Sequence, residues 1–343
     1  MQMHHASLGA LPTNVHRRQN LKRGFLGFST GCGDSRKLDA CPPPDLSQPH
    51  TRAFIASQKS RLAAAAARHW SKRSPTGTCY DAAALGLTGS WFYNWLPQPY
   101  FGKACDHHHQ AAEFVPTITS VGLAEEIMKE ERFTKYWVAS GVTHLLGYNE
   151  PDGYNSNAVS STPAAAAADW VHVQDLAAKF NPPLVLVSPA VVSGVHNDGG
   201  YNSDGVSSWM DEFFGNCTHV VAKCDPSLIK YIAMHDYHGD ISSLMQRIQG
   251  ARARYGRKIW ITELAILKFG QPPSRSVMNA FMKEVLPLLD ASDDVARYAW
   301  LASRNPPNEM NGGSNLLPFD SLSLQPTSTG IIYSLRYEAC STW

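Results

Sequence analysis

Two stretches decide how this chain folds: Thr143-His144-Leu145-Leu146-Gly147-Tyr148-Asn149-Glu150-Pro151-Asp152 and Lys258-Ile259-Trp260-Ile261-Thr262-Glu263-Leu264-Ala265. In each of them a short apolar run with the character of a β-strand ends at a glutamate. A carboxylate at the end of a buried strand is costly unless it is solvated, paired or used in chemistry. Glu150 and Glu263 are therefore the first candidates for functional side chains.

Strand-like segments alternate with helical segments along the rest of the chain. The eight strand candidates are Lys22–Phe28, Gly89–Trp95, Glu113–Ile118, Thr143–Glu150, Leu184–Pro189, Leu228–His235, Lys258–Ala265 and Val295–Leu301. Helices are expected at Thr51–Trp70, Gly122–Ser140, Pro163–Phe180 with Thr162 before its first residue, Val206–Phe214, Ile241–Tyr255, Arg275–Leu289 and Thr329–Arg336. This alternation, over the roughly 250 residues typical of such a domain, predicts an α/β fold of the (β/α)8 TIM barrel type. The chain has no Gly-rich dinucleotide fingerprint, so a doubly wound sheet is the less favoured alternative.

The sequence predicts one large domain. Residues 1–20 are polar and irregular and are expected to form an N-terminal tail. Residues 21–343 are expected to form a single barrel domain with an insertion near residues 29–85. The first part of this insertion is rich in Cys, Pro and Asp, which is typical of a loop.

The composition argues against nucleic-acid and membrane partners. The formal net charge of the 343 residues is +1 at pH 7, which favours neither nucleic acid nor an anionic membrane surface. No apolar run approaches the ~20 residues of a membrane span, and no signal-peptide core is visible at the N-terminus. Charged residues make up only 17% of the chain, which weakly favours a sugar-facing or extracellular surface.

The cysteines and histidines do not have the spacing of a metal site, and no metal or cofactor is expected. Among the seven cysteines, Cys217 and Cys224 bracket a short loop and are candidates for a disulfide. An odd number leaves at least one thiol free or paired between chains. Asn216 begins a glycosylation triplet of a kind that also arises by chance. The three histidines at 107–109 are expected to form a solvated loop, with a weak adventitious metal site as the less favoured alternative.

In a barrel, the side chains at the C-terminal ends of the strands converge on one face. Glu150 and Glu263 would then share one mouth, which fits the two-carboxylate chemistry of glycoside hydrolysis. A retaining mechanism needs the two carboxyl groups about 5–5.5 Å apart, with one pKa raised so that the acid keeps its proton. Asn149 is placed to hydrogen-bond the 2-hydroxyl of a sugar. The alternative is that both glutamates are surface or helix-capping residues at strand–helix junctions.

The chain resembles glycoside hydrolase family 128, the group with the glycosyl-hydrolase catalytic-core domain, within a clan of barrel enzymes whose catalytic glutamates end strands four and seven. The resemblance rests on Lys22-Arg23-Gly24, Trp91-Phe92-Tyr93-Asn94-Trp95, Phe114-Val115-Pro116, Leu146–Asp152, Ser188-Pro189-Ala190, His235-Asp236-Tyr237, Trp260–Ala265 and Tyr298-Ala299-Trp300. Gly-Tyr-Asn-Glu-Pro-Asp is the specific motif among them. The resemblance implies endo-hydrolysis of β-1,3-glucan with retention, no cofactor, and a secreted or cell-wall setting.

The resemblance also implies roles for single residues. Glu150 would be the acid/base, Glu263 the nucleophile, and Trp300 an apolar platform under a sugar ring. The stretch Tyr93-Asn94-Trp95 would line the same cleft, and Asn149 would lie beside the acid/base. A hydrogen bond from Tyr237 or His235 would keep Glu263 ionised. His235 has the alternative of being an ordinary core residue, and Trp95 and Trp300 have the alternative of being core or interface aromatics.

Some features depart from the family pattern. An aspartate, Asp236, stands where an aromatic residue is usual, and this is expected to alter a subsite. The stretch Ser29–Leu85 is longer than expected between the first two strands, and the absence of a visible export signal conflicts with secretion. Three rival functions stay open: a non-catalytic β-glucan-binding protein on the same fold, a barrel hydrolase of another β-glycan such as β-1,4-mannan, and a structural wall protein whose cleft is incidental. A monomer is expected.

Overall fold

The computed structural model describes residues 79–87, 90–99, 112–153, 161–193, 200–268, 270–304, 313–319 and 323–341. Several expected features lie outside these ranges. They are the N-terminal tail, the strand Lys22–Phe28, the helix Thr51–Trp70, most of the insertion, and the histidines at 107–109.

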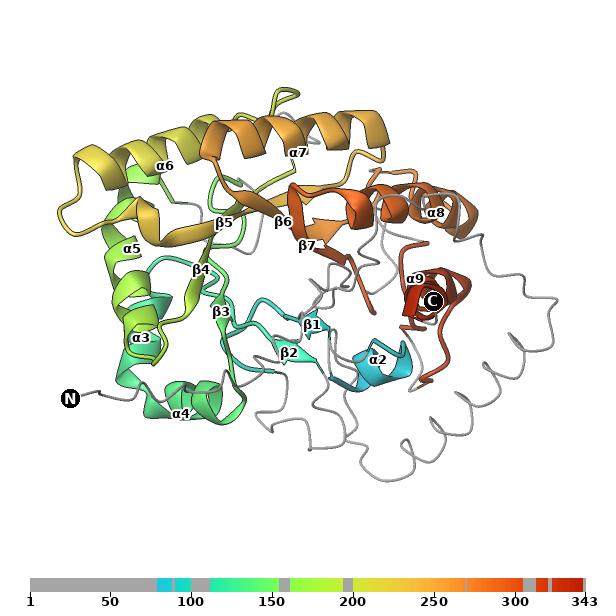
Figure 1. Cartoon of the computed structure of the whole chain (residues 1–343), viewed down its shortest axis with the longest axis horizontal. Helices are drawn as coiled ribbons and strands as arrows, with labels where there is room; N and C mark the ends of the chain where they lie inside the picture. The colour runs from blue at the N-terminus through green and yellow to red at the C-terminus, as the bar shows by residue number, and fades with distance from the viewer. Residues whose placement is uncertain are drawn as a thin grey trace, which may run out of the picture.

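The described strands are all parallel and follow one another in chain order. They are β1 (Trp91–Phe92), β2 (Glu113–Phe114), β3 (His144–Leu145), β4 (Val185–Val191), β5 (Ile229–Asp236), β6 (Lys258–Leu264) and β7 (Val295–Trp300). The pair β1–β2 is joined to the five strands β3–β7 by a parallel bridge between Thr117 and Leu146. The strands curl around a common centre with helices on the outside (Figure 1). These seven strands correspond to seven of the eight expected ones.

The first three strands are shorter than the sequence predicts. Proline supplies no backbone N–H to a sheet, and Pro116 directly follows Val115 after β2 while Pro97 lies shortly after β1. Backbone pairing nevertheless continues past the strand ends, because Val115 N donates to Phe92 O at 2.8 Å and Ile118 N donates to Leu146 O at 2.9 Å. The chain therefore keeps its parallel course to the end of the sheet where Glu150 and Glu263 lie.

The helices alternate with the strands as expected. They are α2 (Cys79–Ala84), α3 (Leu123–Lys129), α4 (Glu131–Ala139), α5 (Pro163–Ala178), α6 (Ser208–His219), the short 3-10 helix η2 (Pro226–Leu228), α7 (Ile241–Tyr255), α8 (Arg275–Ala291) and α9 (Ser328–Ser341). Thr162 caps α5 by accepting a hydrogen bond from Ala165 N, with Pro163 as the first helical residue.

The prediction of a single helix over Gly122–Ser140 is wrong, because the segment forms two helices separated by an extended Glu130. Ile127 of α3 and Phe133 and Trp137 of α4 are all buried. At 100° per residue, one continuous helix would place Ile127 far around from Phe133 on the helix surface. The break at Glu130 turns both apolar faces towards the core.

Two further findings concern the chain as a whole. Cys217 of α6 and Cys224 form a disulfide, as their spacing predicted. None of the helices within the described ranges has the length and apolar character that a membrane crossing requires.

Candidate active site

Glu150 stands just beyond β3, at a sharp change in backbone direction. Its φ angle is 47°, in the left-handed region that a residue with a side chain seldom adopts. Its N–H donates to Ala190 O at 2.7 Å, and the preceding Asn149 N donates to Thr119 O at 3.0 Å. Both neighbouring strands thus hold the turn in place, and backbone strain of this kind is characteristic of functional sites.

Gly147 allows this strand to pack closely against β4. A Cβ atom at Gly147 would lie 2.8 Å from Pro189 N and 2.8 Å from a ring carbon of Trp170. A contact this short requires glycine, which is one physical reason for the Gly in the Gly-Tyr-Asn-Glu-Pro-Asp motif. The close packing fixes the position of Glu150 relative to β4.

Glu263 is the next-to-last residue of β6 and is buried. Both of its carboxylate oxygens accept hydrogen bonds: Trp95 Nε1 donates to Oε1 at 2.7 Å, and the Tyr237 hydroxyl donates to Oε2. Donors to a carboxylate favour its ionised form and fix its orientation. The expectation that Tyr237 donates to Glu263 is confirmed.

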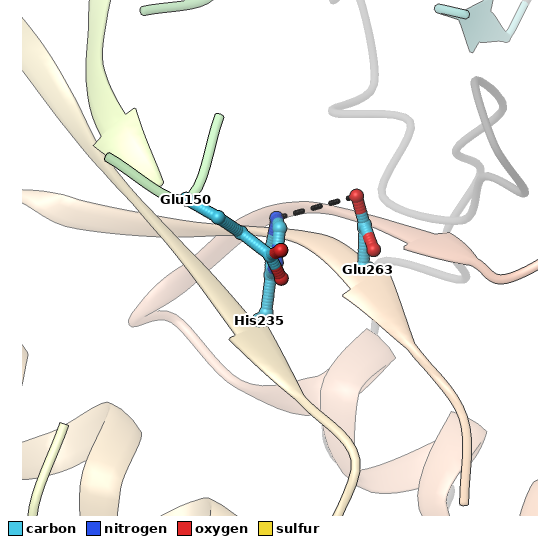
Figure 2. A group of neighbouring side chains, drawn as sticks. All are labelled: Glu150, His235 and Glu263. Atoms are coloured by element: carbon cyan, nitrogen blue, oxygen red, sulfur yellow. Dashed lines mark hydrogen bonds and ion pairs between the residues drawn. The ribbon is translucent and has the colours of Figure 1, made fainter. Parts of the chain in front are cut away.

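His235 lies between the two glutamates. A register irregularity after Met234 makes His235 the direct cross-strand partner of Glu263. Its Nδ1 is 2.9 Å from Glu150 Oε1 and its Nε2 is 3.5 Å from Glu263 Oε1 (Figure 2). The His235 side chain is fully buried, whereas the Glu150 side chain is 20% exposed. Glu150 is therefore the carboxylate of the pair that solvent can reach.

The two carboxylates are close together. One ligand atom each from Glu150, His235 and Glu263 can be chosen so that all three lie within 4.8 Å of one another. This places an oxygen of Glu150 within 4.8 Å of an oxygen of Glu263. Glu150 comes from the segment after β3 and Glu263 from β6, and the His235 ring lies between their carboxylates (Figure 2).

The pKa values of the three groups are coupled through this contact. Burial raises the pKa of Glu263, and the charge of Glu150 adds to the increase, which outweighs the opposing effects of His235, Tyr237 and Trp95. Burial also raises the pKa of Glu150, but the hydrogen bond and charge of His235 outweigh it and hold that pKa below its ordinary value. Burial lowers the pKa of His235, but the two carboxylates outweigh it and raise that pKa.

The three predicted residues that directly follow β1 have different roles. Trp95 is half-buried and reaches Glu263 directly. Tyr93 is buried and donates to Thr262 O at 2.9 Å, so it supports the backbone beside Glu263. Asn94 is also buried: its amide donates to Gln98 O, and its side-chain oxygen accepts from Leu96 N. It stabilises the loop that carries Trp95 and does not line a cleft.

Asn149 is half-buried, and its side chain makes no hydrogen bond within the described part of the chain. It lies next to Glu150, as the sequence predicts, and its contact with a sugar hydroxyl stays a prediction.

The prediction that Trp300 forms a sugar platform is not supported. Trp300 is fully buried, and its Nε1 donates to Ser314 O at 2.9 Å. Its ring packs against Phe281 of α8, and Tyr298, two residues earlier, also reaches α8 through Asp290. Alternate residues of a strand face the same side, so Trp300 lies on the helix-facing side of β7 as a core residue.

The prediction that Asp236 alters a subsite is not supported either. Asp236 is fully buried and accepts hydrogen bonds from Nε and Nη2 of Arg247 on α7. His235 and Tyr237 point towards the glutamates, so the residue between them faces the helix layer. Asp236 fixes α7 against β5 and contributes no surface to the site.

Asp152 has a role that the sequence did not reveal. Its Oδ1 accepts from Val192 N and its Oδ2 from Gly200 N, each at 2.9 Å. One side chain thus ties the chain after β3 to the chain after β4. The only signal in the sequence was its place in the motif, two residues after Glu150.

Paired glutamates at the ends of parallel strands, with donors on one and solvent access to the other, define the site of a glycoside hydrolase. The family model Glycosyl hydrolase catalytic core matches residues 57–333, and the chain belongs to this family. Comparison with curated proteins finds no match.

Ninety-eight chains of solved structures match this chain. A family 128 subgroup II endo-β-1,3-glucanase from Pseudomonas viridiflava is 26% identical, with 73% of this chain and 90% of that chain covered and a TM-score of 0.56. A subgroup I endo-β-1,3-glucanase variant from Amycolatopsis mediterranei, in complex with laminaripentaose, is 23% identical, with coverage of 75% and 93% and a TM-score of 0.56. A subgroup III curdlan-specific exo-β-1,3-glucanase from Blastomyces gilchristii is 26% identical, with coverage of 71% and 88% and a TM-score of 0.51.

Proposed function

We propose that this chain hydrolyses β-1,3-glucan by a two-step mechanism that retains the anomeric configuration. The observation that carries the proposal is the separation of Glu150 and Glu263, whose nearest oxygens lie within 4.8 Å of each other. A retaining enzyme has its carboxyl groups about 5–5.5 Å apart, whereas an inverting enzyme leaves roughly 6.5–9.5 Å for a water molecule. The separation therefore favours direct attack by one carboxylate.

The substrate is proposed from the relatives. Both endo-acting and exo-acting β-1,3-glucanases occur among the similar structures, and one of them is described in complex with laminaripentaose. A laminarin-type glucan is accordingly the proposed substrate, and endo action stays a prediction. We further propose that the seven described strands belong to a complete (β/α)8 barrel.

In the proposed reaction Glu263 attacks the anomeric carbon while Glu150 protonates the departing glycosidic oxygen. Glu150 then removes a proton from water, which displaces the sugar from Glu263. The donors Trp95 and Tyr237 hold the Glu263 carboxylate in a fixed orientation, which is what a nucleophile requires. The solvent access of Glu150 suits a group that must exchange protons with water.

The proton of the acid needs a source, because His235 holds the pKa of Glu150 below its ordinary value in the free protein. The raised pKa of His235 makes its ring a proton donor at 2.9 Å from Glu150 Oε1. We propose that this contact delivers the proton to Glu150 when the sugar replaces water in the site.

The raised pKa of Glu263 favours a second assignment of roles, in which Glu263 is the acid and Glu150 the nucleophile. Glu150→Gln and Glu263→Gln separate the two assignments. Loss of the acid leaves the hydrolysis of an activated aryl β-glucoside largely intact, because a good leaving group needs no protonation. Loss of the nucleophile abolishes both reactions. We expect Glu150→Gln to lose glucan hydrolysis and keep aryl glycoside cleavage.

A reducing-sugar assay on laminarin tests the function itself. The parent chain should release reducing ends, and each Gln variant should be slower by at least roughly a hundredfold. Glu284→Gln, which alters an exposed glutamate of α8, is the matched control and should retain full activity. A parent chain that binds laminarin without cleaving it would instead identify a non-catalytic binding protein. Cleavage of β-1,4-mannan in preference to laminarin would identify the hydrolase of another β-glycan.

The setting of the protein is proposed as extracellular or cell-wall associated, with the chain acting as a monomer. The Cys217–Cys224 disulfide supports this setting, because disulfides persist in oxidising compartments.

A further inference from the structure

We propose that the catalytic centre is also a binding site for a borderline-soft divalent cation such as Zn²⁺, held by His235 Nε2 and Glu263 Oε1. A bound cation would occupy the oxygen that the proposed function assigns to attack, so the site would be inhibitory. The binding part of this proposal does not depend on the proposed function, whereas the inhibition part rests on it.

The first observation is a buried ring nitrogen without a hydrogen bond. His235 Nε2 makes no hydrogen bond within the described part of the chain, although its side chain is fully buried. A buried polar nitrogen that is left unpaired costs free energy and calls for an explanation. This nitrogen is directed at Glu263, as Figure 2 shows. A cation between the two groups would satisfy it.

The second observation is the distance. Nε2 and Glu263 Oε1 are 3.5 Å apart, which is long for a hydrogen bond between a nitrogen and an oxygen. Zinc lies about 2.0–2.1 Å from a histidine nitrogen and about 2.0–2.2 Å from a carboxylate oxygen, so two ligands at a tetrahedral angle are about 3.4 Å apart. The pair therefore has the spacing of two ligands on one tetrahedral ion.

The third observation is the support on the other side of the ring. His235 Nδ1 lies 2.9 Å from Glu150 Oε1. A metal-bound histidine usually donates its other N–H to a carboxylate, which fixes the tautomer and orients the ring. In the neutral ring, with Nδ1–H donating to Glu150, Nε2 has a lone pair for the cation, which takes the place of the Nε2 proton. All three groups also fall within one 4.8 Å cluster, so the supporting carboxylate of Glu150 lies close to the proposed pair of ligands.

The donor set selects the class of cation. One imidazole nitrogen with carboxylate oxygens suits Zn²⁺, Cu²⁺ or Ni²⁺, whereas Mg²⁺ and Ca²⁺ prefer oxygen ligands alone. The partial exposure of Glu150 gives the ion a route from solvent.

The test is a titration of the chelator-treated full chain with ZnCl2 by calorimetry and with CoCl2 by visible absorption, which reports tetrahedral coordination. We expect one site. Glu263→Gln should weaken binding at least tenfold, and Glu150→Gln should weaken it roughly 10–100-fold through the ring support. Circular dichroism of each variant checks that it is folded. Glu284→Gln is the matched control and should bind as the parent does.

A variant expected to bind more tightly makes the test sharper. Trp95→Phe removes the indole N–H that competes for Glu263 Oε1, so its affinity for Zn²⁺ should increase. Equal Zn²⁺ affinity in the parent and in folded Glu263→Gln would place the ion on other histidines and overturn the proposal, as would the absence of binding. If the chain cleaves laminarin, Zn²⁺ should inhibit with a constant equal to its binding constant. Binding without any cleavage by the parent would count against the proposed function alone.

Discussion

Trp95 is the residue through which the first strand pair acts on the site. Its φ angle is 57°, a strained value for a tryptophan, and its carbonyl accepts a hydrogen bond from Thr119 Oγ1. A conformation of this kind costs on the order of 1–3 kcal/mol and persists only where its surroundings enforce it. In this backbone conformation the indole N–H of Trp95 points at Glu263 and donates a hydrogen bond to it. Trp95 is therefore a positioning residue for the carboxylate.

Trp95→Phe should lower kcat/KM on laminarin and shift the acidic limb of its pH profile to higher pH. The N–H stabilises the ionised form of Glu263, so its removal raises the pKa of that carboxyl, and a nucleophile works only when it is ionised. A loss of roughly tenfold is expected at neutral pH. The measurement is kcat/KM as a function of pH.

Trp209→Phe is the control for this shift, because the indole of Trp209 donates to Ser161 O and not to a glutamate. Its acidic limb should coincide with that of the parent. If the limb of Trp95→Phe also stays in place, Trp95 acts only through packing.

Most of the side chains that meet at the site could be predicted from the sequence. The predictions were wrong where they depended on which side of a strand a side chain faces. Glu150, Glu263, His235, Tyr237 and Trp95 are brought together. They were predictable because a motif and a strand end fix their positions. Trp300 and Asp236 were misassigned, because an alternation of one residue decides whether a side chain faces the site or the helices.

At the scale of elements, the Cys217–Cys224 disulfide joins the C-terminal part of α6 to the loop before η2. Seven positions separate the two cysteines. The chain-entropy relation for a loop of this length gives a stabilisation of about 2.5 kcal/mol. The bridge therefore helps to hold α6 in place. A second contact of α6 is the hydrogen bond that Trp209 donates to Ser161 O, on the chain after β3.

The double variant Cys217→Ser, Cys224→Ser should lower the free energy of unfolding by about 2 kcal/mol. Denaturant titration, with and without reductant, measures the change. Reductant should destabilise the parent by a similar amount and leave the double variant unaffected. An unfolding curve that the double substitution does not move would show that the bridge adds nothing to stability.

Element boundaries were the least predictable part of the fold. No Pro or Gly marks the break between α3 and α4 in the sequence, because Glu130 lies within a run of charged residues. It arises from the burial of both Ile127 and Trp137, which is a tertiary effect. By contrast, the Thr162–Pro163 start of α5 is a local signal and was predicted to the residue.

At the scale of the molecule, the inside of the sheet is divided between two polar clusters. Glu150 follows β3, and His235 and Glu263 lie at the C-terminal ends of β5 and β6. The other cluster lies near the N-terminal ends, where Glu113 of β2 meets His144 of β3 at 2.8 Å and Arg297 of β7 at 2.7 Å. In folds of this kind the first end carries chemistry and the second carries stability.

The second cluster joins strands that are remote in the sheet. Glu113 binds Arg297 across the curl from β2 to β7, and the guanidinium lies 4.5 Å from the centre of the Trp260 ring on β6. Burial would raise the pKa of Glu113, but the hydrogen bond from His144 and the charge of Arg297 outweigh it and lower the pKa to about 2. The ionised carboxylate is thus stabilised by the curled arrangement that brings β2, β3 and β7 together.

Glu113→Gln should therefore lower stability and leave catalysis unchanged. A carboxyl group whose pKa is depressed from 4.5 to about 2 on folding stabilises the protein above pH 4.5. That stability is lost as the pH falls from 4.5 towards 2. The expected decrease at pH 7 is about 3 kcal/mol in the free energy of unfolding. The difference between parent and variant should shrink steadily below pH 4.5, as denaturant titrations at a series of pH values would measure.

Glu131→Gln is the matched control, because Glu131 pairs with Lys135 on the exposed surface of α4. An exposed pair of this kind contributes little to stability, so the control should unfold almost as the parent does. The kcat/KM of Glu113→Gln on laminarin should equal that of the parent at temperatures where both are folded. A variant that lost activity without losing stability would mean that the two ends of the sheet are coupled. The cluster at β2, β3 and β7 would then set the geometry of the glutamate pair.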